Sequence, residues 1–227
     1  MRPARERGLH KFIYYVNLKA GSSAVQARLT DAFERSVFRT DAVLAADFRA
    51  ACKGDHKYRS GCFPVRDTRD FFAFSVARDP VAKFESGVRQ AWIHNPGLRN
   101  LTADDMLDKA LADGAFPDLH LEPSTWAMTG TRKGGAPGPN VSFVAKVETL
   151  DADWRALVDR IRPRSVSADQ RDALLEPLPT VNARAAVPRS RLSDAAVRRM
   201  CRSDMFGDEW RCLDYDLPAP CRASSSG

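Results

Sequence analysis

Three short apolar runs stand out along the chain, at residues 11–17 (KFIYYVN), 70–77 (DFFAFSVA) and 142–147 (SFVAKV). Runs of this length that are apolar almost throughout are typical of strands buried on both faces of a parallel sheet. A segment with apolar residues at helical spacing follows each run. Three strand-to-helix units predict an α/β fold with a central, mainly parallel sheet.

The remaining segments predict helices and loops around this sheet. Apolar spacing predicts a helix at 102–111 and a short one at 192–202, whereas the glycine- and proline-rich stretch 130–140 is typical of a mobile loop. At 227 residues the chain fits one domain with insertions. We therefore expect a single domain over residues 1–222 and a disordered tail at 223–227.

Composition and charge narrow the class of protein. With 44% hydrophobic and 9% aromatic residues, the chain has an ordinary globular composition. The formal net charge of +6 favours an anionic partner. The basic residues are scattered and no nucleic-acid-binding signature is present, so we expect no nucleic-acid partner. No run approaches the ~20 apolar residues that cross a membrane, so we expect no membrane span in this chain.

The five cysteines bear on the compartment. Their odd number and the absence of a CxxC pair argue against a zinc site, and Cys52 and Cys62 are spaced to bridge a loop. Asn100 and Asn140 each begin a match to the N-glycosylation acceptor. We therefore expect the Golgi lumen or the secretory pathway, and the cytoplasm instead if the chain is complete without an anchor.

The turn after the first apolar run suits a phosphate. Small residues between a strand and a helix expose backbone N–H groups at the positive end of that helix. Lys19 adds a charge there, and Ser22 and Ser23 add hydroxyl donors. The alternative is a plain connection in which one of the two serines caps the helix. The P-loop pattern is absent because the lysine precedes Gly21, which disfavours an ordinary ATPase or GTPase.

The turn after the second run offers another anion site. Arg78 follows the strand directly, at the edge where open α/β sheets bind ligands, and Ser86 lies about two helical turns further on. An arginine fork and a serine hydroxyl suit a phosphate monoester. The alternative is that Arg78 pairs with Asp79 or caps the helix. Pro80 suits the first turn of that helix.

These two segments, Lys19-Ala-Gly-Ser-Ser and Arg78-Asp-Pro-x-x-Lys-x-x-Ser86, resemble the membrane-associated carbohydrate sulfotransferases. That family has a lysine-x-glycine-serine/threonine loop for the 5′-phosphosulfate and an arginine-aspartate-proline-x-x-basic-x-x-serine motif for the 3′-phosphate. Residues 143–154 and 119–123 are similar to later segments of the family, so the resemblance spans roughly 12–215. The chain departs from the pattern at Ala24, Lys83 and Val88.

The resemblance implies a three-layer, P-loop-like fold and a reaction that needs no metal. It implies the donor 3′-phosphoadenosine 5′-phosphosulfate (PAPS) as co-substrate and an anionic carbohydrate acceptor. Arg78 and Ser86 would hold the 3′-phosphate, and Lys19 would stabilise the leaving 5′-phosphate. The 5′-phosphosulfate turn that the resemblance implies consists of Lys19, Ala20, Gly21, Ser22, Ser23 and Ala24.

A base must take the proton of the acceptor, and histidine or carboxylate groups suit this role. Related carbohydrate sulfotransferases place such a base near His56, so we take His56 as the first candidate. His120 is the second and Glu122 the third, whereas His10 and His94 look peripheral. A solvated loop histidine is the ordinary alternative for His56.

The sequence leaves several classes of acceptor possible. The arginines and the lysine of two loop segments are candidates to line a cleft for an anionic sugar, although each taken singly is better explained as a solvated surface charge. A small metabolite, a lipid or a tyrosine is an alternative acceptor, and a non-catalytic module that binds polyanions is a further alternative. The candidate cleft residues are Arg66, Arg69, Arg132 and Lys133.

Overall fold

The computed structural model describes residues 11–15, 17, 19–40, 71–129, 141–161, 167–179 and 190–222. In this part of the chain three strands form one sheet, in the order β1 (Lys11–Tyr15), β2 (Phe71–Ala77) and β3 (Phe143–Lys146). Both neighbouring pairs are parallel. The predicted mixed α/β architecture with a parallel sheet is therefore confirmed.

Each strand leads into a helix, as the apolar spacing predicts. The helices that follow the strands are α1 (Ser22–Thr40), α3 (Pro80–His94) and α6 (Leu150–Arg160). The other helices of the described residues are α4 (Ala103–Asp113), α5 (Ser124–Thr129), α7 (Ala168–Leu175), α8 (Asp194–Arg202), α9 (Glu209–Cys212) and α10 (Ala219–Arg222). Three short 3-10 turns are η2 (Pro96–Asn100), η3 (Leu119–Leu121) and η4 (Val147–Thr149).

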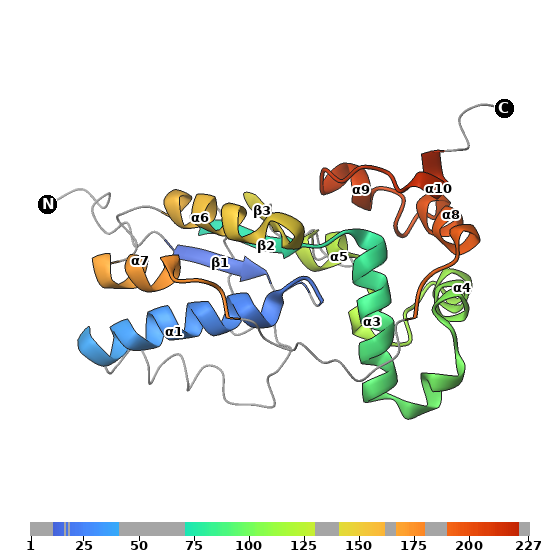
Figure 1. Ribbon diagram of the computed structural model, residues 1–227, viewed down its shortest axis with the longest axis horizontal. Helices are drawn as coiled ribbons and strands as arrows, with labels where there is room; N and C mark the ends of the chain where they lie inside the picture. The colour runs from blue at the N-terminus through green and yellow to red at the C-terminus, as the bar shows by residue number, and fades with distance from the viewer. Residues whose placement is uncertain are drawn as a thin grey trace, which may run out of the picture.

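Helices α1, α6 and α7 pack together with the sheet around one apolar cluster (Figure 1). Trp154 lies at its centre: the ring is 2% exposed, packs edge-on against Phe74 and donates its N–H to the backbone oxygen of Leu174 at 2.6 Å. The buried Arg28 of α1 donates to Glu176 after α7 at 2.8 Å. This cluster fixes the angle at which α1 leaves the sheet.

The second large cluster is helical and builds on α3. Helix α3 crosses the molecule next to the sheet and packs against α4, α8 and α9 (Figure 1). Along β2 the side chains alternate between clusters: Phe74 and Val76 join the sheet cluster, whereas Ala77 packs with Met128 and Leu213. Ala77, Met128 and Leu213 form a third, smaller cluster. Strand β2 leads directly into α3, so this strand and helix connect the sheet with the helical part.

The predicted helices at 102–111 and 192–202 are present as α4 and α8. A reciprocal pair of hydrogen bonds between Thr102 and Asp105 starts α4, and Gly114 in the left-handed region ends it. A disulfide between Cys201 and Cys221 links α8 to α10. The sequence analysis did not foresee this pair. The pair suggested by the sequence, Cys52 with Cys62, lies outside the described residues. Cys212 lies within them and is an exposed thiol.

Among the helices of the described ranges, none has both the length and the apolar character that crossing a membrane requires.

Candidate functional site at the carboxyl edge of the sheet

The carboxyl ends of the three strands meet at one edge of the sheet. Strands β1 and β2 run in register, with Tyr15 opposite Ser75, so the turns that follow them begin side by side. The buried Asn17 side chain donates to the backbone oxygen of Val76 at 2.9 Å. This bond fixes the first predicted phosphate turn to the end of the strand that carries the second.

The first turn has two residues with left-handed backbone conformations. Lys19 has φ of +64° and Gly21 has φ of +70°. The conformation suits Gly21, but for Lys19 it costs about 1 kcal/mol. The backbone oxygen of Gly21 accepts from the N–H groups of Ala24 and Val25, so α1 begins at once and the N–H groups of Ser22 and Ser23 belong to its first turn. Helix geometry points such first-turn N–H groups toward the N-terminal end of the helix.

The side chains of the predicted turn differ in exposure. Ala20 is fully buried and Ser22 is 8% exposed, whereas Lys19, Ser23 and Ala24 are half-buried. The Lys19 ammonium group donates to the side-chain oxygen of Gln90 on α3 at 3.3 Å. The structure therefore places Lys19, the residue predicted to stabilise the leaving 5′-phosphate, against α3.

The second turn starts α3 in the way that its sequence predicts. Asp79 caps the helix, because its carboxylate accepts from the N–H of Ala82 at 2.8 Å, and Pro80 is the first helical residue. The residue that caps the N-terminus of α3 is thus Asp79 and not Arg78. The N–H of Asp79 itself donates to Glu148 at 3.0 Å.

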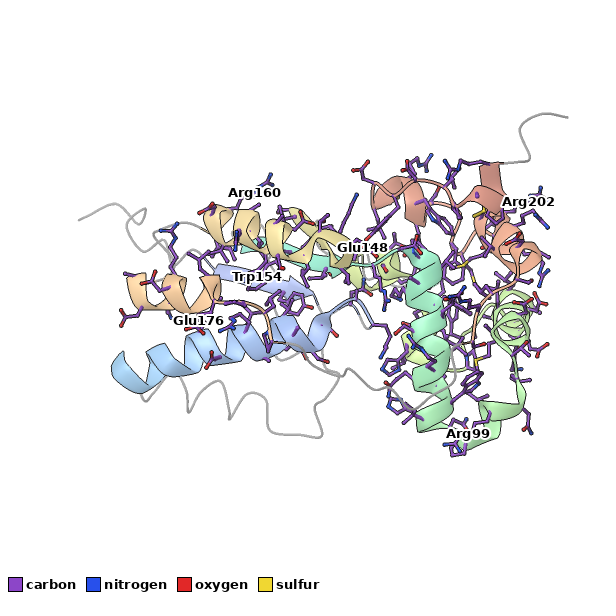
Figure 2. All side chains as sticks on the ribbon, viewed as in Figure 1. Arg99, Glu148, Trp154, Arg160, Glu176 and Arg202 are labelled. Atoms are coloured by element: carbon purple, nitrogen blue, oxygen red, sulfur yellow. A yellow bond between two sulfur atoms is a disulfide. The ribbon has the colours of Figure 1, made fainter. Side chains whose placement is uncertain are left out.

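Glu148 joins the end of β3 to the turn after β2. It lies between α6 and the start of α3 (Figure 2), and its second oxygen accepts from the Tyr215 hydroxyl at 2.7 Å. Burial raises the pKa of Tyr215, and the bond to Glu148 and the charge there raise it further. Burial also raises the pKa of Asp79, with Glu148 adding to the effect. Glu148 therefore holds the edge together and makes it locally acidic.

An arginine-lined pocket opens beside α3. It has a volume of about 270 Å³, and its lining residues are Arg78, Ala82, Glu85, Arg89, Ser190 and Arg191. Glu85 accepts from the N–H of Leu192 at 3.0 Å, and the Ser190 hydroxyl accepts from the N–H of Ala103 at 3.2 Å. Segment 190–192 is thus held against α3 and α4. Three arginines against one carboxylate make this pocket suited to an anion.

The position of Ser86 connects this pocket with Lys19. At about 100° per residue, Ser86 lies on α3 between the stripe of Ala82 and Arg89, which faces the pocket, and that of Gln90, which holds Lys19. Ser86 is 7% exposed. The structure therefore places Arg78 at the pocket and Lys19 at Gln90, whereas Ser86 lies on the buried face between them and does not line the pocket.

Lys83, the basic residue of the second motif, is buried. It is 3% exposed and its ammonium group donates to the backbone oxygen of Glu122. Burial lowers the pKa of Lys83 to about 8, against the opposing charges of Glu209 and Glu122. Burial raises the pKa of Glu209, which accepts from the N–H of Thr125 at 2.8 Å. Lys83 thus joins α3 to the segments of Glu122 and Glu209 and does not line the pocket.

A cluster of two histidines and one aspartate lies next to Lys19 along α3. His120 is 7% exposed, and Nδ1 of His120 lies 2.5 Å from Asp118 Oδ1. The His94 ring packs edge-on against His120, and Nε2 of His94 lies 2.7 Å from the amide nitrogen of Gln90. His94, which looked peripheral in the sequence, therefore stands between the lysine partner Gln90 and the predicted base His120.

Asp118 carries the negative charge of this cluster. Burial opposes that charge, but hydrogen bonds from the ring and the backbone N–H of His120, together with the nearby histidine charges, lower the pKa of Asp118. One ligand atom from each of His94, Asp118 and His120 lies within 4.8 Å of the others, so these three residues could hold a metal ion. Among the residues that the structure describes, these three form the group of His, Cys, Asp and Glu side chains whose ligand atoms lie close enough to share a metal ion.

Several predicted site residues fall outside the described part of the chain. They include His56, the first candidate base, and the candidate acceptor residues Arg66, Arg69, Arg132 and Lys133. The sequence analysis did not single out Arg89 or Arg191. Arg89 follows Ala82 by seven residues and so shares its helical face, which is a readable signal, whereas Arg191 reaches the pocket only through the fold.

Comparison of the chain with protein-family models, with curated proteins and with solved structures finds no match in any of the three.

Proposed function

We propose that this protein is a sulfotransferase that transfers the sulfuryl group of PAPS to a hydroxyl or amine of a carbohydrate acceptor. The observation that carries the proposal is the meeting of the two motif turns at one sheet edge, joined by the bond from Asn17 to Val76 and by Lys19 on α3. The proposal includes the three-layer fold of the sulfotransferases that the motifs resemble.

The turn of Lys19 and Gly21 would hold the 5′-phosphosulfate end of the donor. The first-turn N–H groups of α1 and the positive end of its dipole favour an anion there. Gly21 keeps the backbone in a left-handed conformation that brings these groups into one turn. The Lys19 ammonium group would neutralise the charge that develops on the leaving oxygen, which is the main electrostatic requirement of the step.

The pocket of Arg78, Arg89 and Arg191 would hold the 3′-phosphate end. A phosphate monoester carries close to two negative charges, and three arginines against Glu85 leave a positive net charge of about the same size. ATP has no 3′-phosphate, so this pocket would also distinguish the donor from ATP. Arg78 comes from the predicted motif, whereas the other two arginines complete the pocket from α3 and from segment 190–192.

The transfer breaks one sulfur–oxygen bond and forms a new sulfur–oxygen or sulfur–nitrogen bond. The acceptor oxygen or nitrogen forms a bond to sulfur while the bond from sulfur to the 5′-phosphate oxygen breaks. The electron pair of the broken bond stays on that phosphate, next to Lys19. The proton of the acceptor goes to a base, so the products are the sulfated acceptor, 3′-phosphoadenosine 5′-phosphate and one proton. Positioning and charge stabilisation suffice for such a step.

Of the candidate bases, His120 and Glu122 lie in the described part of the chain, and His120 is the one that belongs to a series of polar groups leading to Lys19. It lies on η3, whose backbone packs directly on Gly87 of α3, and the cluster that includes His120 reaches Lys19 through Gln90. We therefore propose His120 as the base, with His56 retained as the alternative. The carbohydrate nature of the acceptor follows from the motif resemblance alone.

The disulfide between Cys201 and Cys221 supports a lumenal setting. Stable disulfides are typical of proteins in oxidising compartments, and sulfation of glycans takes place in the secretory pathway. Asn100, which begins one glycosylation match, is exposed. We propose the Golgi lumen or the secretory pathway on this basis.

A transfer assay tests the proposal. Purified protein is incubated with PAPS and a panel of glycans and small alcohols, and the products are analysed by mass spectrometry for the addition of one sulfuryl group. We expect transfer to a glycan and its loss in Lys19→Met. Lys109→Met is the matched control, since Lys109 is exposed and pairs with Asp113 on α4. Transfer that persists in Lys19→Met would remove that lysine from the mechanism, and transfer only to small alcohols would overturn the carbohydrate acceptor.

A further inference from the structure

A series of polar groups runs from Lys19 to His120, with hydrogen bonds at both ends and a longer distance between ring nitrogen and carboxylate in the middle. It begins with Lys19 on the side-chain oxygen of Gln90 at 3.3 Å and continues from the Gln90 amide nitrogen to His94 Nε2 at 2.7 Å. Nδ1 of His94 lies 3.6 Å from Asp118 Oδ2. The other oxygen of Asp118 lies 2.5 Å from Nδ1 of His120. The series links the side chain that would stabilise the leaving phosphate, Lys19, with the candidate base, His120.

The chemistry of Lys19 fixes the direction of the first contacts. A lysine ammonium group only donates, so the oxygen of the Gln90 amide faces it and the amide nitrogen faces His94. That nitrogen also only donates, so Nε2 of His94 must accept. A neutral histidine with an accepting Nε2 carries its proton on Nδ1, the atom that faces Asp118.

Asp118 fixes the other end in the same way. An ionised carboxylate only accepts, so Nδ1 of His120 must donate to it. Oδ1 of Asp118 also accepts from the backbone N–H of His120 at 2.8 Å, which holds the carboxylate in the plane of the turn. With the proton on Nδ1, the nitrogen of His120 that carries a lone pair is Nε2.

We propose that Asp118 is a positioning residue that holds His120 with its ring proton on Nδ1, so that Nε2 is its basic nitrogen, and that Gln90 holds the ring proton of His94 on Nδ1. The assignment of Nε2 as the base of sulfuryl transfer rests on the proposed function, whereas the position of the proton does not. Asp118 acts directly on the His120 ring, and Gln90 acts on the His94 ring. Lys19 is thereby coupled to the tautomer of His94.

The contact between Asp118 and His120 fits a hydrogen bond better than joint ligation of a metal. Two ligands about 2 Å from a tetrahedral zinc ion lie roughly 3.3 Å apart. Oδ1 of Asp118 and Nδ1 of His120 are 2.5 Å apart, within the range of a charge-assisted hydrogen bond. A metal at this cluster would have to separate the two groups, and this alternative is an outcome of the test below.

Histidine nitrogen spectroscopy measures the tautomer without any substrate. The full chain is labelled with ¹⁵N-histidine, and two-bond ¹H–¹⁵N correlations are recorded about two pH units above the ordinary histidine pKa of about 6.5. We expect protonated Nδ1 and unprotonated Nε2 for both His94 and His120. A proton on Nε2 of His120 would overturn the proposal, and so would stoichiometric binding of added Zn²⁺ that removes the Nδ1–H state.

Variants then separate the links of the series. Asp118→Asn should let the proton of His120 shift toward Nε2, while Asp113→Asn, a surface control on α4, should leave both rings unchanged. Gln90→Leu should redistribute the proton of His94 but leave His120 on Nδ1. A His120 tautomer that ignores Asp118→Asn would overturn the positioning role.

The kinetic readout depends on the proposed function and is therefore read separately. In protein that binds 3′-phosphoadenosine 5′-phosphate, Asp118→Asn should lower kcat about a hundredfold with the KM for the donor unchanged. An unchanged kcat would overturn His120 Nε2 as the base. Protein that fails to bind this nucleotide would refute the proposed function, while the spectra would still decide the tautomer.

Discussion

The Asn17 side chain donates a 2.9 Å hydrogen bond to the backbone oxygen of Val76, and through it the turn before α1 is fixed to the end of β2. Both groups are buried, and the next residues along the two segments are those of the candidate donor site. Three turns meet here, because the N–H of Asp79 also donates to Glu148 at the end of the third strand. The site is thus built on backbone groups at the ends of parallel strands.

Asn17→Ala should lower the free energy of unfolding by about 1–3 kcal/mol, because the oxygen of Val76 loses its donor in a buried place. Chemical denaturation of the variant and the parent protein measures this difference. Asn100→Ala is the control, since Asn100 is exposed, and its stability should not change. An Asn17→Ala protein as stable as the parent would show that the bond does not hold the two turns together.

Two glycines should respond differently to a methyl group. In Gly21→Ala the new Cβ finds ordinary contacts of 3.5 Å with Val147 and Leu150, so the cost is that of φ +70°, about 1 kcal/mol. In Gly87→Ala the Cβ collides with the backbone oxygen of His120 and lies 2.9 Å from its carbonyl carbon, at a cost of about 3 kcal/mol or more. Thermal and denaturant unfolding rank the two. Equal losses would contradict the close packing of η3 on α3.

Because of Lys83, the free energy of unfolding should depend on pH in the alkaline range. Its pKa is about 8 in the folded chain and the ordinary 10.5 in the unfolded chain, so between these values the unfolded state binds more protons. The free energy of unfolding then rises with pH, and the penalty of burying the charge is fully present below about pH 8. Across this window the free energy of unfolding of the parent protein should rise by up to about 3 kcal/mol relative to that of Lys83→Met. Parallel denaturation curves at each pH measure the gain, and a constant difference would show that Lys83 titrates normally.

The disulfide should stabilise the helical part of the molecule. It closes a loop with a sequence separation of 20 residues between Cys201 and Cys221, for which chain entropy predicts about 3 kcal/mol. The double variant Cys201→Ser, Cys221→Ser should lose this amount, and a reductant should produce the same loss in the parent protein alone. Cys212→Ser should change nothing, since Cys212 is an exposed free thiol. Insensitivity of the parent to reductant would mean that the bond is absent in solution.

The strands could be predicted from the sequence because their apolar runs need no tertiary information. The same holds for the start of α3, where Asp79 and Pro80 are local signals of a helix N-terminus. These features depend on neighbours in sequence. The turn at Gly21 was likewise readable, since a strand, a small-residue turn and a helix follow one another directly.

Contacts between distant segments could not be read in this way. Arg191 lies far along the chain from Arg78, and only the path of segment 190–192 across α3 brings both to one pocket. His94 seemed peripheral because its partners Gln90 and Asp118 meet it through helical spacing and through the return of η3 to α3. The pairing of Cys201 with Cys221 depends in the same way on how α10 packs on α8.

The central claim is that the edge of the sheet binds a nucleotide with a 3′-phosphate, and calorimetric titration with 3′-phosphoadenosine 5′-phosphate tests it most directly. We expect binding that ATP does not reproduce and that weakens at least tenfold in Arg78→Ala and in Arg191→Ala, about 1.4 kcal/mol each. Arg202→Ala, on the exposed end of α8, is the matched control and should bind like the parent protein. Folded protein that does not bind this nucleotide, or that binds ATP equally well, would contradict the account.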